Sequence, residues 1–138
     1  MSMENQQNWV YSEITEGIKV SVIPEFYPEG SNREQSVFVW LYNVKIENLG
    51  TNGFQIIGRH WQIFDAHGKM DEIEGAGVVG YQPIIRSGET FEYTSQVRLF
   101  THSGLMRGEY YGRNLDSGQQ IVVTIPAFSL DTAIEPIN

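Results

Sequence analysis

The chain has 138 residues, no cysteine, and 17 acidic against 9 basic residues, for a formal net charge of -8. This length predicts one domain with a hydrophobic core of its own, and the lack of cysteine excludes disulfides, thiolate metal sites and a cysteine nucleophile. Since an acidic surface repels phosphate backbones, we expect no general nucleic-acid binding. No apolar run approaches the roughly 18 residues of a membrane span, and the polar N-terminus does not resemble a signal peptide, so we expect a cytoplasmic protein.

Residues 1–16 have a polar composition, which predicts a lead-in that precedes the folded domain. Strict alternation of apolar and polar side chains then begins at Gly17, with Ile18, Val20 and Val22 on one side. This pattern predicts a strand, and Pro24 limits how far that strand can pair centrally.

Two longer strands are predicted over residues 35–48 and 54–65. The first is rich in β-branched and aromatic residues on both faces, so we expect it to lie centrally. A side-chain period of two divides the other into two faces, with Ile57, Arg59, Trp61 and Ile63 on one and Ile56, His60 and Phe64 on the other. We therefore expect Trp61 in the core. Arg59, on the same face, requires a carboxylate or carbonyl partner near the rim of the sheet.

Four more strands follow, over residues 70–74, 90–99, 106–111 and 121–125, and residues 131–138 form a tail. Gly108 predicts a bulge in the third of these strands. No window shows helical periodicity. About seven short strands joined by turn residues predict an all-β fold, an antiparallel β-sandwich of the immunoglobulin type in a single domain over residues 17–130, with a small barrel as the alternative.

A GxGxxG pattern runs from Gly75 through Gly77 to Gly80. In dinucleotide-binding folds this motif requires a helix that starts at the glycines, but here two valines, a glycine and Pro83 follow, so we reject that function. Two interpretations remain open. Either the glycines permit positive φ angles or close strand crossing at a sheet edge, or the backbone N–H groups hold an anion with help from Arg59 or Arg86.

The potential metal ligands are three histidines and several acids near them, and none has the spacing of a known metal site: His60, His67, His102, Asp65, Asp71, Glu72 and Glu74. We expect solvated turn charges there, no metal site and no cofactor. The serines lack the nucleophile-elbow context, so we predict no catalytic residues.

Six segments of the chain, in this order, resemble the ApaG family: residues 59–61, 64–68, 74–83, 91–95, 104–110 and 125–128. The chain departs from the family pattern at Tyr81, where a charged residue is common, and at Ala76, where glutamate or proline is frequent. It also has Gln96-Val97 in place of the usual Gly-Cys or Gly-Thr.

The resemblance implies a sandwich of fibronectin type III-like fold. It also implies an association with diadenosine-polyphosphate hydrolysis and with cobalt and magnesium efflux in bacteria, and a protein-binding role in eukaryotic F-box and polymerase-interacting proteins. The family has no established catalytic residues to carry over.

Our hypothesis from the sequence is a non-enzymatic binding module that recognises a protein, with an indirect role in divalent-cation homeostasis. The alternatives are a binder of nucleotides, polyphosphates or another small anion and, beyond that, a hydrolase of such ligands. The expected binding residues are Arg59, His60, Gly75, Gly77, Gly80 and Gln82. Exposed sheet edges would also allow a homodimer.

Overall fold

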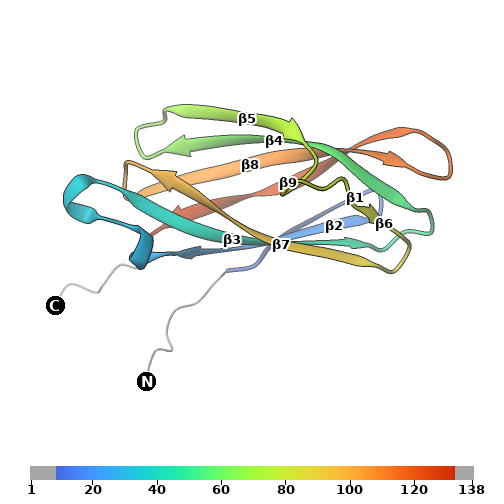
Figure 1. Ribbon diagram of the computed structural model, residues 1–138, viewed down its shortest axis with the longest axis horizontal. Coiled ribbons are helices and arrows are strands. Elements are labelled where there is room, and N and C mark those ends of the chain that lie inside the picture. Colours follow the sequence, from blue (N-terminus) through green and yellow to red (C-terminus); the bar gives the residue numbers. More distant parts are fainter. Residues whose placement is uncertain (1–8, 133–138) are drawn as a thin grey trace, which may run out of the picture.

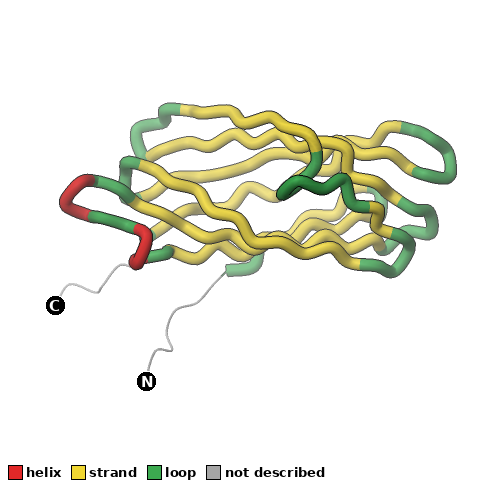
Figure 2. The backbone as a smooth tube through the Cα atoms, in the orientation of Figure 1, coloured by secondary structure: helices red, strands yellow, loops and turns green. Residues whose placement is uncertain are grey.

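The computed structural model of the protein describes residues 9–132 and consists almost entirely of strands. Two antiparallel sheets pack face to face, and the helical segments in the described part are two 3₁₀ turns, η1 Pro28–Gly30 and η2 Arg33–Gln35 (Figures 1 and 2). The predicted sandwich is confirmed and the barrel alternative is wrong, because the strands divide into two separate sheets. None of the described helical segments is long or apolar enough to cross a membrane.

The first sheet has the order β1-β2-β3-β7. Its members are β1 Tyr11–Thr15, β2 Ile18–Phe26, β3 Phe38–Asn48 and β7 Thr90–Leu99. Strand β3 is buried along most of its length, as its dense apolar sequence predicts for a central strand.

The second sheet has the order β5-β4-β8-β9, and the short strand β6 pairs with the beginning of β4. Its members are β4 Phe54–Asp65, β5 Met70–Ala76, β6 Ile84–Ile85, β8 Ser103–Asn114 and β9 Gln120–Asp131. Strand β9 lies against β1 and β2 of the first sheet. The glycine-rich loop, residues 77–83, connects β5 to β6 at the other side of the sandwich, towards β7 (Figure 1).

Aromatic side chains from both sheets fill the core. Trp61 is buried, as predicted, and its ring meets that of Phe128 edge-on at a centroid distance of 6.0 Å. Trp40 is also buried, and its indole N–H donates to the carbonyl of Asp131 at 2.9 Å. These contacts join β3, β4 and β9 and determine the position of the second sheet on the first.

A bulge in β4 changes which side chains enter the core. Ile56 lies opposite Gly112 of β8 and Gly58 lies opposite the preceding residue, so Ile57 has no partner in that ladder. The extra residue reverses the alternation of core-facing and outward-facing side chains along β4, because two residues of β4 then lie opposite one residue of β8. Ile56 is therefore buried on the same side as Trp61, and the prediction that it shares the face of His60 is wrong.

The sandwich also includes residues that were predicted to lie outside it. Glu16 and Gly17 both have positive φ and form a tight turn that pairs β1 with β2, so residues 11–15 belong to the first sheet. The described part of the chain contains nine strands, and β1 and β6 are the ones that the sequence pattern missed. At the other end β9 extends to Asp131. The remainder of the predicted lead-in and tail, residues 1–8 and 133–138, lies outside the described residues.

Candidate functional site

The glycine-rich loop ends in a tight turn formed by residues 78–81. Val78 and Tyr81 exchange two backbone hydrogen bonds of 2.7 and 2.8 Å, and the central residues Val79 and Gly80 have φ angles of 42° and 85°. Positive φ at both central positions is the geometry of a type I′ turn. Val78 is completely buried below the turn, whereas the side chains of Val79 and Tyr81 are 49% and 65% exposed. The loop therefore has a fixed base and an apolar, exposed tip.

The three glycines of the GxGxxG pattern have different structural roles. A Cβ atom on Gly77, which has a φ of +61°, would lie 1.9 Å from the carbonyl oxygen of Tyr81. A Cβ atom on Gly75 would lie 2.8 Å from the guanidinium of Arg59. Gly80 has open space around it and a φ of +85°. Close approach and backbone conformation thus account for the glycines, and the first of the two interpretations of the motif explains the geometry.

Arg59 binds the loop from inside the sandwich. Its Nη1 atom donates to the carbonyl oxygens of Ala76 at 3.1 Å and Gly77 at 3.0 Å. The prediction that Arg59 has a carbonyl partner near the sheet rim is confirmed. Gln82 supports the other end of the loop, because its side-chain amide donates to the carbonyl of Ile57 at 3.0 Å. Of the predicted binding residues, Arg59, Gly75, Gly77 and Gln82 therefore meet at the base of the loop, and Gly80 lies at its tip.

A cluster of three tyrosines lies near Arg59, between the two sheets: Tyr42 and Tyr110 are buried and Tyr93 is half-buried. The hydroxyls of Tyr93 and Tyr110 are hydrogen-bonded to each other. Burial raises the pKa of Tyr42, Tyr93 and Tyr110, and the charge of Arg59 offsets a small part of that rise. These phenols are neutral at physiological pH, so the positive charge of Arg59 is not neutralised by a tyrosinate.

His60 is the next residue along β4, and it points to the outer face of the second sheet, away from Arg59. Its Nδ1 atom lies 3.0 Å from a carboxylate oxygen of Glu109 on β8, and its Nε2 atom lies 2.8 Å from one of Glu72 on β5. The hydrogen bonds to Glu109 and Glu72 raise the pKa of His60, and the bond from His60 lowers the pKa of Glu72. This His60 row, Glu72–His60–Glu109, joins three adjacent strands and is separate from the base of the loop.

The His60 row has the chemistry of a structural ion pair. Both ring nitrogens are engaged with carboxylates, so neither is directed at a common point where a metal could sit. Among residues 9–132 no group of three histidine, aspartate or glutamate side chains has the arrangement of a metal site. A shallow hollow of about 260 Å³ lies beside the row and is lined in part by His60, Glu109 and Arg107.

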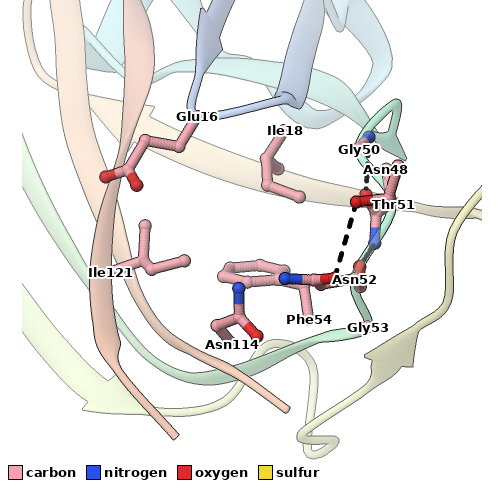
Figure 3. A pocket seen from close by; sticks show the side chains of 10 residues that line it. All are labelled: Glu16, Ile18, Asn48, Gly50, Thr51, Asn52, Gly53, Phe54, Asn114 and Ile121. Carbon is pink, nitrogen blue, oxygen red and sulfur yellow. Dashed lines mark hydrogen bonds between the residues drawn. The ribbon is translucent and has the colours of Figure 1, made fainter. Parts of the chain in front are cut away.

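A second pocket of about 200 Å³ opens at one end of the sandwich, where three turns meet (Figure 3). Its wall includes the buried Asn48, whose amide nitrogen donates to the carbonyls of Asn52 and Ile85, both at 2.8 Å. The amide oxygen of Asn48 accepts from the N–H of Gly50 at 3.0 Å. Asn48 thus holds the β3–β4 turn against β6. None of the six predicted binding residues lines this pocket.

Comparison with known proteins gives the family. The model of the ApaG domain matches residues 28–114. The chain belongs to the ApaG family. Protein ApaG of Rhodospirillum centenum is 50% identical over 123 residues, covering 89% of this chain and 94% of its own, and Protein ApaG of Methylocella silvestris is 47% identical over 124 residues with the same coverage. The crystal structure of an ApaA protein from Bordetella pertussis has a TM-score of 0.82 at 42% identity and covers 84% of this chain and 94% of its own.

Membership of the ApaG family confirms the resemblance found in the sequence. It does not name a ligand. Sequence reasoning selected the residues at the base of the loop, but it missed Glu72 and Glu109 as partners of His60, because strand register brings them together from positions 12 and 49 residues away. It also gave no indication that Val79 would adopt a positive φ.

Proposed function

We propose that this ApaG protein is a non-enzymatic, cytoplasmic protein-binding module, and that it contributes indirectly to Co²⁺ and Mg²⁺ homeostasis through its partner. The contact surface is the tip of the glycine-rich loop, formed by Val79 and Tyr81, together with the exposed Ile84 of β6. The observation that carries the proposal is the conformation of Val79, an exposed β-branched residue held at a positive φ.

Positive φ is unfavourable for a β-branched residue, and such strained positions gather at binding and catalytic sites. Glycine or asparagine would adopt the same turn at lower cost. Val79 is held there by the hydrogen bonds of the turn, by the buried Val78 and by the bonds from Arg59 to the loop backbone. A rigid loop loses little entropy on binding, and tyrosine is among the residues that contribute most to protein interfaces.

Two observations favour a binding module over an enzyme. The His60 row commits the imidazole to two carboxylates, which disfavours it as a general base or a metal ligand. Burial keeps the hydroxyls of Tyr93 and Tyr110 neutral, because it raises the pKa of both well above the usual value.

Polyphosphate binding by the loop has less support than protein binding. The N–H groups of Gly77, Val78 and Tyr81 all donate to backbone carbonyls within the protein, and Arg59 is directed at two further carbonyls. An anion cradle requires such groups to be free to converge on the ligand.

The test compares Tyr81→Ser with Phe100→Ser, whose side chains are 65% and 64% exposed in the native protein. Affinity-tagged forms are used to capture partners from a lysate of the native organism, and each captured protein is purified for direct affinity measurement. We expect Tyr81→Ser to weaken the complex at least about tenfold, as loss of an aromatic interface residue does. Phe100→Ser should bind as the wild type does. An equal loss of affinity in both variants, or no loss in either, would contradict the proposed surface.

A homodimer through an edge strand is a further proposal on partners. Sedimentation equilibrium over a hundredfold concentration range distinguishes it from a monomer, because a dimer of this chain doubles the mass.

A further inference from the structure

Strand β5 forms an open edge of the second sheet. It pairs with β4 over seven consecutive positions, from Gly58 opposite Ala76 to Phe64 opposite Met70. In the described part of the chain no strand pairs with its other side, where it ends the order β5-β4-β8-β9 (Figure 1). Six of its seven residues are exposed. Such an edge presents backbone N–H and C=O groups to any strand of complementary sequence.

The hydrogen bonds at the two ends of the hairpin determine which residues of β5 face outward. The N–H of Asp65 donates to the carbonyl of Lys69, and the N–H of Gly77 donates to the carbonyl of Ile57. Because hydrogen-bonded and non-hydrogen-bonded pairs alternate in an antiparallel ladder, the odd-numbered residues of β5 bond to β4. The N–H and C=O groups of Met70, Glu72 and Glu74 therefore point away from β4, as does the N–H of Ala76, whereas the carbonyl of Ala76 accepts from Arg59.

The side chains on the two sides of β5 differ in character. Glu72 and Glu74 project to the outer face, where Glu72 bonds to His60. Ile73 projects to the opposite side of the strand and is 45% exposed. A strand paired with this edge would thus meet Glu72 and Glu74, flanked by Met70 and Ala76, on one of its faces, and the apolar Ile73 beside Asp71 on the other.

The same glutamates oppose pairing of β5 with a second copy of itself. Three antiparallel registers let two copies of β5 overlap over most of the strand. They are centred on Ile73, on Glu72 and on Glu74, so that the central residue lies opposite the same residue of the other copy. The first register places Glu72 opposite Glu74 twice, and each of the other two places a glutamate opposite its own copy. Like charges directly opposite each other destabilise a strand pair, so the edge disfavours this homodimer.

We propose that β5 is a strand-addition site for an extended, basic segment of a partner protein, which pairs antiparallel with it. The segment carries lysine or arginine opposite Glu72 and opposite Glu74, and an apolar residue between them opposite Ile73. This proposal rests on the proposed protein-binding function and names the chemistry of the partner. The net charge of -8 adds long-range attraction for such a segment.

The first experiment uses two fluorescein-labelled peptides of equal composition, one in which lysine alternates with valine and one in which the lysines are consecutive. Fluorescence anisotropy measures their affinity for the full-length protein. We expect the alternating peptide to bind at least about tenfold more tightly, because only alternation matches the two faces of the edge. Amide resonances of Met70, Glu72, Glu74 and Ala76 should shift most. Equal affinities, or shifts centred elsewhere, overturn the proposal.

Charge reversal on β5 and on β7, the terminal strand of the first sheet, provides a matched pair of variants. Glu74→Lys should weaken the alternating peptide about fivefold, as expected for loss of one cross-strand charge pair and gain of a like-charge pair. The same variant should self-associate in sedimentation. In the register centred on Ile73, the new lysine of each copy lies opposite Glu72 of the other copy. Glu92→Lys on β7 should change neither the affinity for the alternating peptide nor the mass in sedimentation. A Glu74→Lys protein with wild-type peptide affinity and wild-type mass contradicts the charge argument.

Failure of this proposal can be told apart from failure of the proposed function. If Tyr81→Ser abolishes a complex while the alternating peptide does not bind, the loop is a protein-binding surface and the assignment of β5 is wrong. If neither experiment shows binding, both proposals are wrong.

Discussion

At the scale of single residues, the loop depends on glycines at positions where the backbone has a positive φ. Gly77 and Gly80 both have positive φ, but only Gly77 is enclosed, by the carbonyl of Tyr81. Substitution at Gly80 therefore measures the cost of the backbone conformation alone, whereas substitution at Gly77 adds the cost of a steric clash.

Gly77→Ala should destabilise the protein by about 3 kcal/mol or more, since a steric clash with backbone adds to the cost of a left-handed conformation. Gly80→Ala should cost only about 1 to 2 kcal/mol, which is the conformational term alone. Urea unfolding followed by tryptophan fluorescence measures both. Equal costs would show that Tyr81 moves away readily and that the turn is not rigid.

Arg59 contributes two of the hydrogen bonds that connect the loop to the sandwich. Replacing it by methionine retains much of the apolar stem and removes both bonds to the loop carbonyls. We expect the amides of residues 77–82 to exchange with solvent at least about tenfold faster, since bonds from a charged donor contribute about 1.5 to 3 kcal/mol each. Arg86→Met is the control, and hydrogen exchange with mass spectrometry is the measurement. Unchanged exchange would mean that Val78 alone holds the loop.

At the scale of secondary structure, the His60 row joins three neighbouring strands of the second sheet. The pKa of His60 is raised by its bonds to Glu109 and Glu72. A raised pKa means that the folded state binds the proton more tightly than the unfolded state. The stabilisation is therefore complete below the unfolded value of about 6.5 and is lost as the pH rises through the folded value.

The pH dependence of unfolding should change when His60 is replaced. The difference in urea midpoint between the wild type and His60→Gln should be largest near about pH 6 and should shrink by about pH 9. His102→Gln, on the β7–β8 turn, is the control and should follow the wild-type curve. A constant difference across this range would assign the effect of His60 to packing alone.

The strands themselves could be predicted from the sequence wherever side chains alternate, as in β7 and β9. Strand β1 was missed because Ser12, Glu13 and Ile14 are all exposed and show no apolar alternation. The bulge at Ile57 could not be foreseen either, since a period of two does not reveal an extra residue. The requirement that Arg59 find a carbonyl partner was predictable, because a guanidinium on the core-facing side of a strand needs an acceptor as it leaves water. The partners of His60 depend on register, which no single strand specifies.

At the scale of the whole molecule, charge and loop geometry together bear on ligand class. The protein carries a net charge of -8, and the loop amides of Gly77, Val78 and Tyr81 are hydrogen-bonded internally. Both features disfavour a polyphosphate ligand.

We therefore expect the melting temperature to stay constant on addition of millimolar ATP, pyrophosphate or diadenosine tetraphosphate, with or without Mg²⁺. A ligand that binds only the folded state must raise it. Sodium chloride at matched ionic strength is the control. A rise of several degrees with one of these ligands, beyond that in the control, would favour the anion-binding alternative.

The buried tyrosines give the sandwich an optical property of its own. Burial raises the pKa of Tyr42, Tyr93 and Tyr110 above that of a free phenol, so the three hydroxyls keep their protons while the sandwich is intact. Once the two sheets separate, the three hydroxyls enter water and ionise near about pH 10. In strongly alkaline solution, separation of the sheets therefore produces a step of tyrosinate absorbance in the near ultraviolet. The chain carries an intrinsic chromophore that reports whether its two layers are together.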